Sequence, residues 1–350
     1  MFWTFIKTQL ATAFSFTRDG SISKLVYLVS LVSLGFIVIF VVLLGFYWSS
    51  EPAPFSVEQK AVERLASASK EYVVGSTTVV ALVTVAEKLL EKPGGYLSND
   101  VFPPGIYLDN ISNWEFGALV QVRDLARTFR ESFSRSQSQS IEDPDLIISE
   151  PKFHFSNDSW LFPPTESEYA EAIDRLDSYL ERISDSDNTD AQFYARADNL
   201  ADWLLAVESR LGSLSQRLSA SVRAQRVDTD AAGEIAVAKF MPARSVVSTK
   251  TPWLKIDDVF YEARGATWAL MHFLQAVEVD FQDVLQDKNA ETSLSQIIRE
   301  LESSQRSIFF PIILNGSGFG IFANHSLVMA NYISRANAAI IDLRILLSQG

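Results

Sequence analysis

One uninterrupted apolar stretch, Leu25–Trp48, dominates the hydrophobic pattern of this chain because it contains no charged residue. At about 1.5 Å per residue, a helix of this length would reach about 36 Å, which exceeds the roughly 30 Å of a bilayer's hydrocarbon core. Tyr27 near one end and Tyr47 and Trp48 at the other fit the aromatic belts of the two interfaces. The pattern predicts one transmembrane helix over residues 25–48, rather than a buried core helix.

The flanks of this stretch predict its orientation. Three basic residues precede it within residues 1–24, whereas the first basic residue after it is Lys60. Because basic flanks stay on the cytoplasmic side, we expect the N-terminus in the cytoplasm and the body, residues 49–350, outside it. The lead, residues 1–24, fits a short interfacial helix or a disordered segment equally well. No small-x-small site follows the stretch before Glu51, so the stretch is typical of a signal anchor and not of a cleaved signal peptide.

Apolar residues recur at helical spacing through most of the body. The most regular series steps by four and three, as in long helices that pack at shallow angles; it comprises Phe193, Ala197, Leu200, Leu204, Val207, Leu211, Leu214 and Leu218. An antiparallel partner within the chain is the favoured interpretation, and a coiled coil in a homo-oligomer is the alternative. Because alternating strand and helix patterns are missing, we predict an all-α fold: one N-terminal transmembrane helix followed by a long-helix bundle with irregular loop insertions.

Segments rich in Pro, Gly and Ser separate the predicted helices of the body. Ser56 is a predicted N-cap after the stiff spacer Glu51–Pro54. Val73–Leu90 is predicted to be a buried helix, since its charge-free part is too short for a second span. Ile141–Pro164 is predicted to be a loop, and Val227–Pro252 is predicted to be a loop or a region of short elements. The remaining helices are expected at Val57–Lys70, Trp114–Phe133, from Thr165 onward, Thr189–Arg223, Leu254–Gln286, Ser293–Ile308 and Met329–Leu347.

Composition narrows the classes of partner. The net charge of −13 disfavours nucleic acid and an anionic membrane surface as main partners, because both select basic faces. The chain has no cysteine, which excludes disulfides, thiolate metal sites and a cysteine nucleophile. Hydrophobic residues make up 47% of the chain, which is enough for a full core.

Candidate catalytic chemistry is sparse in this sequence. None of the histidines, His154, His272 and His325, stands in an H-E-x-x-H or Glu-x-x-His motif, so we expect neither a metal site nor a cofactor. Ser149 and Lys152 match the S-x-x-K spacing. Pro151 between them argues against the shared helical face that this pair needs.

The glycine-rich turn NGSGFG is the most conspicuous local motif. Its residues Asn315, Gly316, Gly318 and Gly320, with His325 after them, form the candidate binding site, because glycine turns before a helix can cradle an anion. The alternative, which we favour, is a tight helix–helix turn that needs positive φ angles. The nearly uncharged stretch Phe309–Phe322 around it is predicted to be buried, with an exposed contact patch as the alternative.

Several long strings together resemble one bacterial family. They are KPGGYLSND, NWEFGALVQVRDLAR, SRSQSQS, QFYARADNL, RLGSLSQRLSAS, IDDVFYEARG and NGSGFGIFANHSLVMANYISRANAAIIDLR. Over nearly its full length the chain is similar to domain-of-unknown-function family 2333 of Gram-negative bacteria. The resemblance implies a single-pass inner-membrane protein with a large helical part. It implies no activity and no catalytic residue.

Two functions from different classes follow from these features. The first is a non-enzymatic scaffold, held in the bilayer by residues 25–48, that binds another envelope protein through its helices. The second is an envelope hydrolase acting on wall or lipid material. A polar cleft that holds His272 or His325 beside buried carboxylates would favour the hydrolase, whereas a filled bundle with an exposed apolar face would favour the scaffold.

Overall fold

The computed structural model confirms the all-α fold class. It describes residues 22–136, 141–185, 190–221, 224–227, 246–307, 313, 315 and 324–349. The described residues are helical apart from turns, connecting segments and one antiparallel ribbon, in which β1 (Ala224–Val227) pairs with β2 (Val246–Thr249). The predicted interfacial lead lies almost entirely outside the described residues, as do most of Phe309–Phe322 and of Val227–Pro252.

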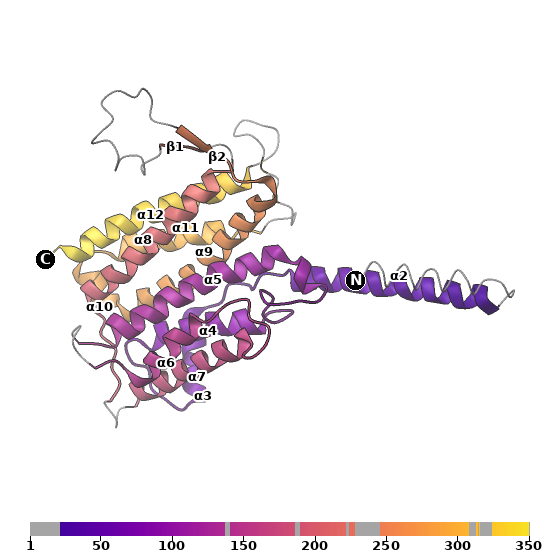
Figure 1. The fold of residues 1–350 in the computed structure, drawn as a ribbon. Helices are drawn as coiled ribbons and strands as arrows, with labels where there is room; N and C mark the ends of the chain where they lie inside the picture. Colours follow the sequence, from indigo (N-terminus) through magenta and orange to yellow (C-terminus); the bar gives the residue numbers. More distant parts are fainter. Residues whose placement is uncertain are drawn as a thin grey trace, which may run out of the picture.

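Helix α2 (Ile22–Trp48) projects from the rest of the molecule as a single rod, which Figure 1 shows in indigo. Its part Val26–Trp48 is long and apolar enough to cross a membrane, and only 6% of its most apolar window is buried. Because a core helix would be covered on most sides, α2 is not a core helix of the body.

The body consists of two groups of helices that lie one above the other in Figure 1. The first group comprises α3 (Val57–Ser67), α4 (Ser76–Glu91), α5 (Asp109–Thr128, continued by the π-helical turn Phe129–Phe133), α6 (Pro144–Phe153) and α7 (Thr165–Ile183). The second comprises α8 (Ala197–Ser219), α9 (Ile256–Asp280), α10 (Gln282–Asp287), α11 (Glu291–Ser304) and α12 (His325–Ser348). Short 3₁₀ turns, Gly105–Tyr107 and Trp253–Lys255, precede α5 and α9.

Helices α5 and α9 join the two groups along their lengths. A Cβ atom at Gly117 of α5 would overlap the carbonyl oxygen of Glu262, and one at Gly265 of α9 would overlap that of Trp114. Only glycine lets two helix backbones approach this closely. Next to this contact the buried rings of Trp114 and Trp268 lie 5.1 Å apart. The crossing of α5 and α9 is thus the centre of the core.

The apolar series on α8 has its partner in the same chain. Helix α12 packs along α8, where the Ser215 hydroxyl lies 2.6 Å from that of Ser334 and Arg344 pairs with Glu208. The order of these contacts makes the two helices antiparallel, as the favoured interpretation of the series predicted.

The prediction of a buried helix over Val73–Leu90 is confirmed by α4, whose first three turns are almost fully buried. Its N-terminus needs a partner for its free amides, and Asp280 supplies one. The Asp280 carboxylate accepts hydrogen bonds from the Thr78 amide at 2.7 Å and the Thr78 hydroxyl at 2.6 Å. Burial raises the pKa of Asp280.

Three predictions of local structure were wrong. The segment Ile141–Pro164 contains helix α6, since Asp143 caps its start and Pro144 occupies its first turn. The helix predicted over Thr189–Arg223 begins only at Ala197, so Phe193 lies in the preceding segment. The helix predicted over Leu254–Gln286 ends at Asp280, and the chain then turns into α10.

Candidate functional site at the junction of helix α2 and the body

The predicted glycine-turn site is described only at its edges. Gly316, Gly318 and Gly320 lie outside the described residues, so the binding of a ligand there stays a prediction. Asn315 holds the start of α12: its side-chain amide donates to the Ser326 hydroxyl at 2.6 Å, and its side-chain oxygen accepts from the Ser326 amide at 3.1 Å.

His325, the last residue of that predicted site, lies half-buried at the first position of α12. Asn324 immediately before it is the N-cap of the helix, and its side chain accepts from the Leu327 amide at 3.0 Å. The described part of the motif therefore begins a helix.

The fully buried His272 is bound on both ring nitrogens. Its Nδ1 donates to the Trp268 carbonyl oxygen at 2.8 Å, and its Nε2 accepts from the Phe55 amide at 3.1 Å. The Phe55 ring stacks on the imidazole with a centroid distance of 4.0 Å. Burial lowers the pKa of His272 to about 4, so the ring is neutral near pH 7. This histidine attaches the chain at Phe55 to helix α9.

The other candidate catalytic groups are engaged in structural contacts. Ser149 and Lys152 do share helix α6, against the prediction that Pro151 would separate them. Ser149 nevertheless donates to the Ala172 carbonyl oxygen at 2.9 Å, and Lys152 pairs with Glu168 at 2.7 Å. Within the described residues no group of three or more His, Asp or Glu side chains is placed to hold a metal ion.

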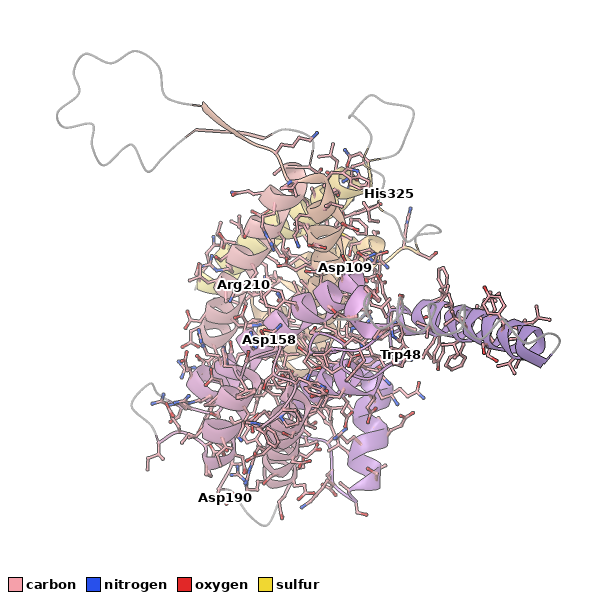
Figure 2. All side chains as sticks on the ribbon, turned by 45° about the vertical axis from the view of Figure 1, so that its right-hand side comes forward. Trp48, Asp109, Asp158, Asp190, Arg210 and His325 are labelled. Carbon is pink, nitrogen blue, oxygen red and sulfur yellow. The ribbon has the colours of Figure 1, made fainter. Side chains whose placement is uncertain are left out.

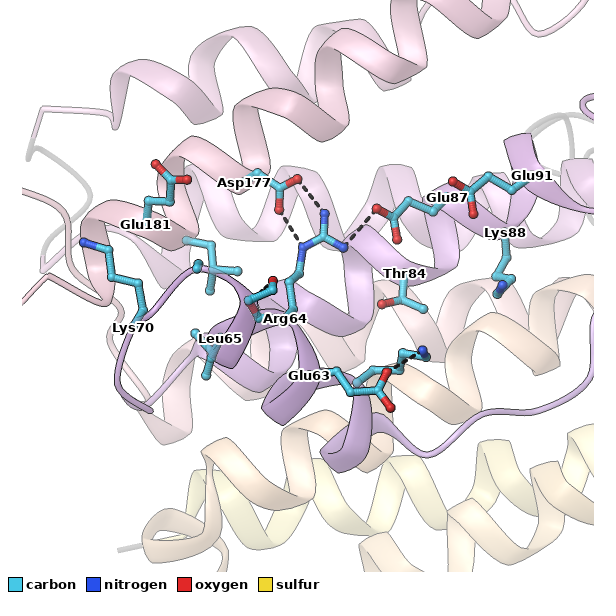
Figure 3. Close-up of a pocket in the computed structure, with 14 residues that line it drawn as sticks. Glu63, Arg64, Leu65, Lys70, Thr84, Glu87, Lys88, Glu91, Asp177 and Glu181 are labelled. Carbon is cyan, nitrogen blue, oxygen red and sulfur yellow. Dashed lines mark hydrogen bonds and ion pairs between the residues drawn. The ribbon is translucent and has the colours of Figure 1, made fainter.

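A groove of about 500 Å³ lies between helices α3, α4 and α7, and Figure 3 shows its residues. Arg64 occupies its middle and binds Asp177 through Nε at 2.8 Å and Nη2 at 2.5 Å, and Glu87 through Nη1 at 2.9 Å. The wall holds further charges of both signs, namely Lys60, Glu63, Lys70, Lys88, Glu91 and Glu181. The ion pairs of Arg64 with Glu87 and Asp177 hold α3 against α4 and α7, and they leave the central cation of the groove already bound.

The segment between α2 and α3 is bound to the body at two points. Arg264 of α9, which is buried, binds Glu51 through Nε at 2.8 Å and Nη2 at 2.5 Å. The same guanidinium donates to the carbonyl oxygens of Ser304 at 3.2 Å and Arg306 at 3.0 Å. The second point is Phe55 on His272. The predicted stiff spacer Glu51–Pro54 therefore lies along α9 between two anchored ends.

Directly after the spacer, the predicted N-cap is confirmed. The Ser56 side chain accepts from the Gln59 amide at 3.3 Å at the start of α3. The chain therefore enters the body as a helix immediately after its second attachment point.

A fully buried ion pair shapes the loop that follows α4. Lys92 Nζ lies 2.5 Å from Glu115 Oε1, and neither side chain is exposed. Glu115 also accepts from the amides of Leu97 and Ser98 at 2.8 Å each. Burial raises the pKa of Glu115, while Lys92 acts in the opposite direction. The pair fixes the loop Lys92–Asp100 on helix α5.

This loop and the next one receive the end of α2. Gly94 has a φ of 90°, and a Cβ there would lie 2.7 Å from Cγ of Trp48. Gly45, on the preceding turn of α2, is buried, and a Cβ there would lie 3.4 Å from Pro104. Figure 2 shows Trp48 where α2 leaves the body. We call the contacts of Gly45, Trp48, Glu51 and Phe55 with the body the junction.

The junction was not predicted from the sequence. Glu51 entered the prediction only as a residue beyond the apolar stretch, and His272 only as a candidate ligand. The partners of Glu51 and Phe55 lie 213 and 217 residues further along the chain, so no local pattern indicates them. The signal that was available is the pair of prolines in Glu51–Pro54, which indicates a segment of fixed conformation.

Comparison with known proteins gives one match. Residues 21–350 match the model of a family described as an uncharacterized protein conserved in bacteria, DUF2333. Neither the curated proteins nor the solved structures include a significant match to this chain. Because the match covers α2, the junction and the whole body, the chain belongs to family DUF2333.

Proposed function

We propose that this protein is a single-pass inner-membrane scaffold. Helix α2 spans the bilayer with the N-terminus in the cytoplasm, and the helical body lies in the periplasm, where it binds another envelope protein. The exposed apolar surface of α2 supports the anchor, since such a surface is stable in lipid and costly in water. The basic residues of the lead support the orientation.

The junction is the observation that carries this proposal. A long flexible linker, rich in Gly and Ser, would leave a tethered domain free to turn. Here the connection is short, contains two prolines and is bound by Arg264 and His272. Such a connection fixes the orientation of the body relative to α2. Fixed orientation is useful for presenting a binding face at a defined angle to the membrane.

The interior of the body favours the scaffold over the envelope hydrolase. His272 lies against Phe55 and Trp268 in a packed aromatic cluster, and its hydrogen bonds go to backbone atoms. The groove beside Arg64 is closed by ion pairs between its own walls. The polar cleft that a hydrolase of wall or lipid material would need is not formed around His272.

Photo-crosslinking in intact cells tests the scaffold. A crosslinking residue is placed at the exposed positions Val62, Tyr72 and Ile345 of the body and, as a matched control, at the buried Leu211. We expect one discrete adduct with an envelope protein from an exposed position and none from Leu211. Release of soluble products from wall or lipid material by the purified full chain, without any such adduct, would instead establish the hydrolase.

A reporter that is active only in the periplasm, fused after Gly350, tests the topology separately. We expect an active fusion. A silent periplasmic reporter together with an active cytoplasmic one would reverse the proposed orientation.

A further inference from the structure

Two Phe-Pro-Pro turns on the body expose large apolar side chains beside the junction. They are Phe102–Pro104, before α5, and Phe162–Pro164, before α7. Phe162 is 92% exposed. The ring of Phe102 lies 6.0 Å from that of Trp160, so the two turns touch through aromatic side chains.

These turns belong to an apolar surface that we call the collar. The collar comprises the exposed side chains of Phe102, Tyr107, Trp160, Phe162, Trp253 and Leu254. The segments that carry them, residues 101–108, 159–165 and 252–254, contain no charged residue. A soluble surface rarely gathers so many exposed aromatic side chains without a contact to make.

The three segments lie around the end of α2. Pro104 packs on Gly45 of α2, which places the first Phe-Pro-Pro turn directly at the junction. Asn99 donates to the Ser159 carbonyl oxygen at 2.9 Å and so links the second turn to the loop before the first. Figure 2 shows Asp109 close to where α2 enters the body.

The third segment lies near the start of α5, where Asp109 is the first residue. The carboxylate of Asp109 is close enough to act electrostatically on Lys255 and Asp257, and Lys255 directly follows Leu254. Trp253 and Leu254 therefore stand beside the start of α5, as Tyr107 does.

We propose that the collar inserts into the headgroup region of the bilayer around α2, so that the body lies on the membrane surface. This inference rests on the proposed function, because α2 must span the bilayer for its end to mark the interface. Tyr47 and Trp48 at that end are the residue types that lie at headgroup depth. Because the collar begins at this end, where Pro104 packs on Gly45, its Trp, Tyr and Phe side chains are placed at a similar depth, where aromatic side chains are stable.

The proposed attraction between the collar and the bilayer is apolar and not ionic. The collar segments carry no basic residue, and the net charge of −13 opposes binding to anionic lipid. The contact therefore does not depend on anionic lipid and is made with zwitterionic lipid alone. A protein bound at the collar is the competing occupant, and the experiment below separates the two.

The absence of native cysteine allows single-cysteine labelling of the full chain. Tyr107→Cys, Phe162→Cys and Leu254→Cys are labelled with an environment-sensitive fluorophore. Val38→Cys reports on α2, and Ile141→Cys is the matched control, since Ile141 is an apolar side chain that is 95% exposed. Ile141 follows the far end of α5, whose Asp109–Thr128 helix is about 30 Å long at about 1.5 Å per residue.

Each labelled protein is reconstituted in phosphatidylcholine nanodiscs that contain lipids with a nitroxide at shallow or deep positions. We expect a blue shift and a loss of emission with the shallow quencher at the three collar positions. We expect a loss of emission with the deep quencher at Val38 and no change of emission with either quencher at Ile141. Added anionic lipid should not strengthen the collar signals, because the net charge of −13 opposes binding to anionic lipid. Unaltered helical circular dichroism confirms that each variant is folded, which exposed positions should permit.

Every other pattern overturns the inference in a distinguishable way. Deep quenching at Val38 without quenching at the collar would leave the anchor intact and remove the collar contact, as an occupied or solvent-facing collar requires. An absence of quenching both at the collar positions and at Val38 would also contradict the proposed transmembrane placement of α2. Equal quenching at the collar and at Ile141 would indicate non-specific adsorption, and collar quenching that appears only with anionic lipid would indicate an ionic contact.

Discussion

Removal of one partner of the buried ion pair between Lys92 and Glu115 tests how the loop that receives Trp48 is held on α5. In Lys92→Met the carboxylate of Glu115 loses its counter-ion but stays fully buried on α5. In Glu115→Gln the ammonium group of Lys92 is left with the Gly95 carbonyl oxygen as a partner. Either change leaves a charge in a place that water does not reach.

The structure sets the size and the pH dependence of the effect. Breaking a buried ion pair on one side costs about 3–5 kcal/mol, because the remaining charge has lost its compensation. In Lys92→Met the pKa of Glu115, already raised by burial, should rise further without the opposing cation. The folded state then binds a proton that the unfolded state does not, so the stability lost in Lys92→Met should partly return as the pH falls. Glu115→Gln has no such group and should show no such recovery.

The assay is equilibrium unfolding of the full chain in nanodiscs, followed by circular dichroism. The double variant Lys92→Met with Glu115→Gln removes both charges and should be more stable than either single variant, since replacing both partners is often nearly neutral. Single variants within about 1 kcal/mol of the wild type, or a double variant that shows the sum of both losses, would refute this reasoning.

Three further predictions concern the packing of the body. Burial lowers the pKa of His272 to about 4, so as the pH falls the unfolded state binds a proton on this histidine before the folded state does. The wild type should therefore lose about 3 kcal/mol of unfolding free energy relative to His272→Gln between about pH 7 and about pH 4. Parallel pH profiles of the two proteins would contradict this. Gly265→Ala should lower the free energy of chemical unfolding by about 3 kcal/mol, because the new methyl group overlaps the backbone of Trp114. Gly212→Ala on α8 is the control: the nearest atom to its new methyl group lies at 3.7 Å, so this change should raise the free energy of unfolding by about 0.5–1 kcal/mol. Leu211→Asp should abolish cooperative thermal melting, and an unchanged melt would refute its place in the core.

Helices whose apolar residues repeat at helical spacing could be predicted from the sequence. Helix α2 follows from the absence of charge, and α8 from its four-three steps, because each pattern reports the surroundings of a single element. Helix α6 was missed although Asp143 and Pro144 together are a helix-start signal. The helix is only ten residues long, so the Pro, Ser and acidic content of the surrounding region outweighed that signal.

The junction could not be predicted for a different physical reason. The pairs Glu51 with Arg264 and Phe55 with His272 connect segments more than half the chain apart, and periodicity carries no information about such pairs. Each residue alone has an ordinary local explanation: an acid after an apolar stretch, a histidine on a buried helix. Only the fold brings them together and shows that both serve to hold the same spacer.

Three of the seven strings that carry the family resemblance meet near this place. KPGGYLSND supplies Lys92, which holds its loop on α5, and NWEFGALVQVRDLAR supplies Glu115, its partner. IDDVFYEARG supplies Arg264, which binds the spacer, and Gly265, which lets α9 approach α5. These residues make one continuous set of contacts from the end of α2 through the loop and α5 to α9. These three strings therefore supply contacts that attach the body to α2 and fix its orientation, which is a property that the proposed scaffold requires.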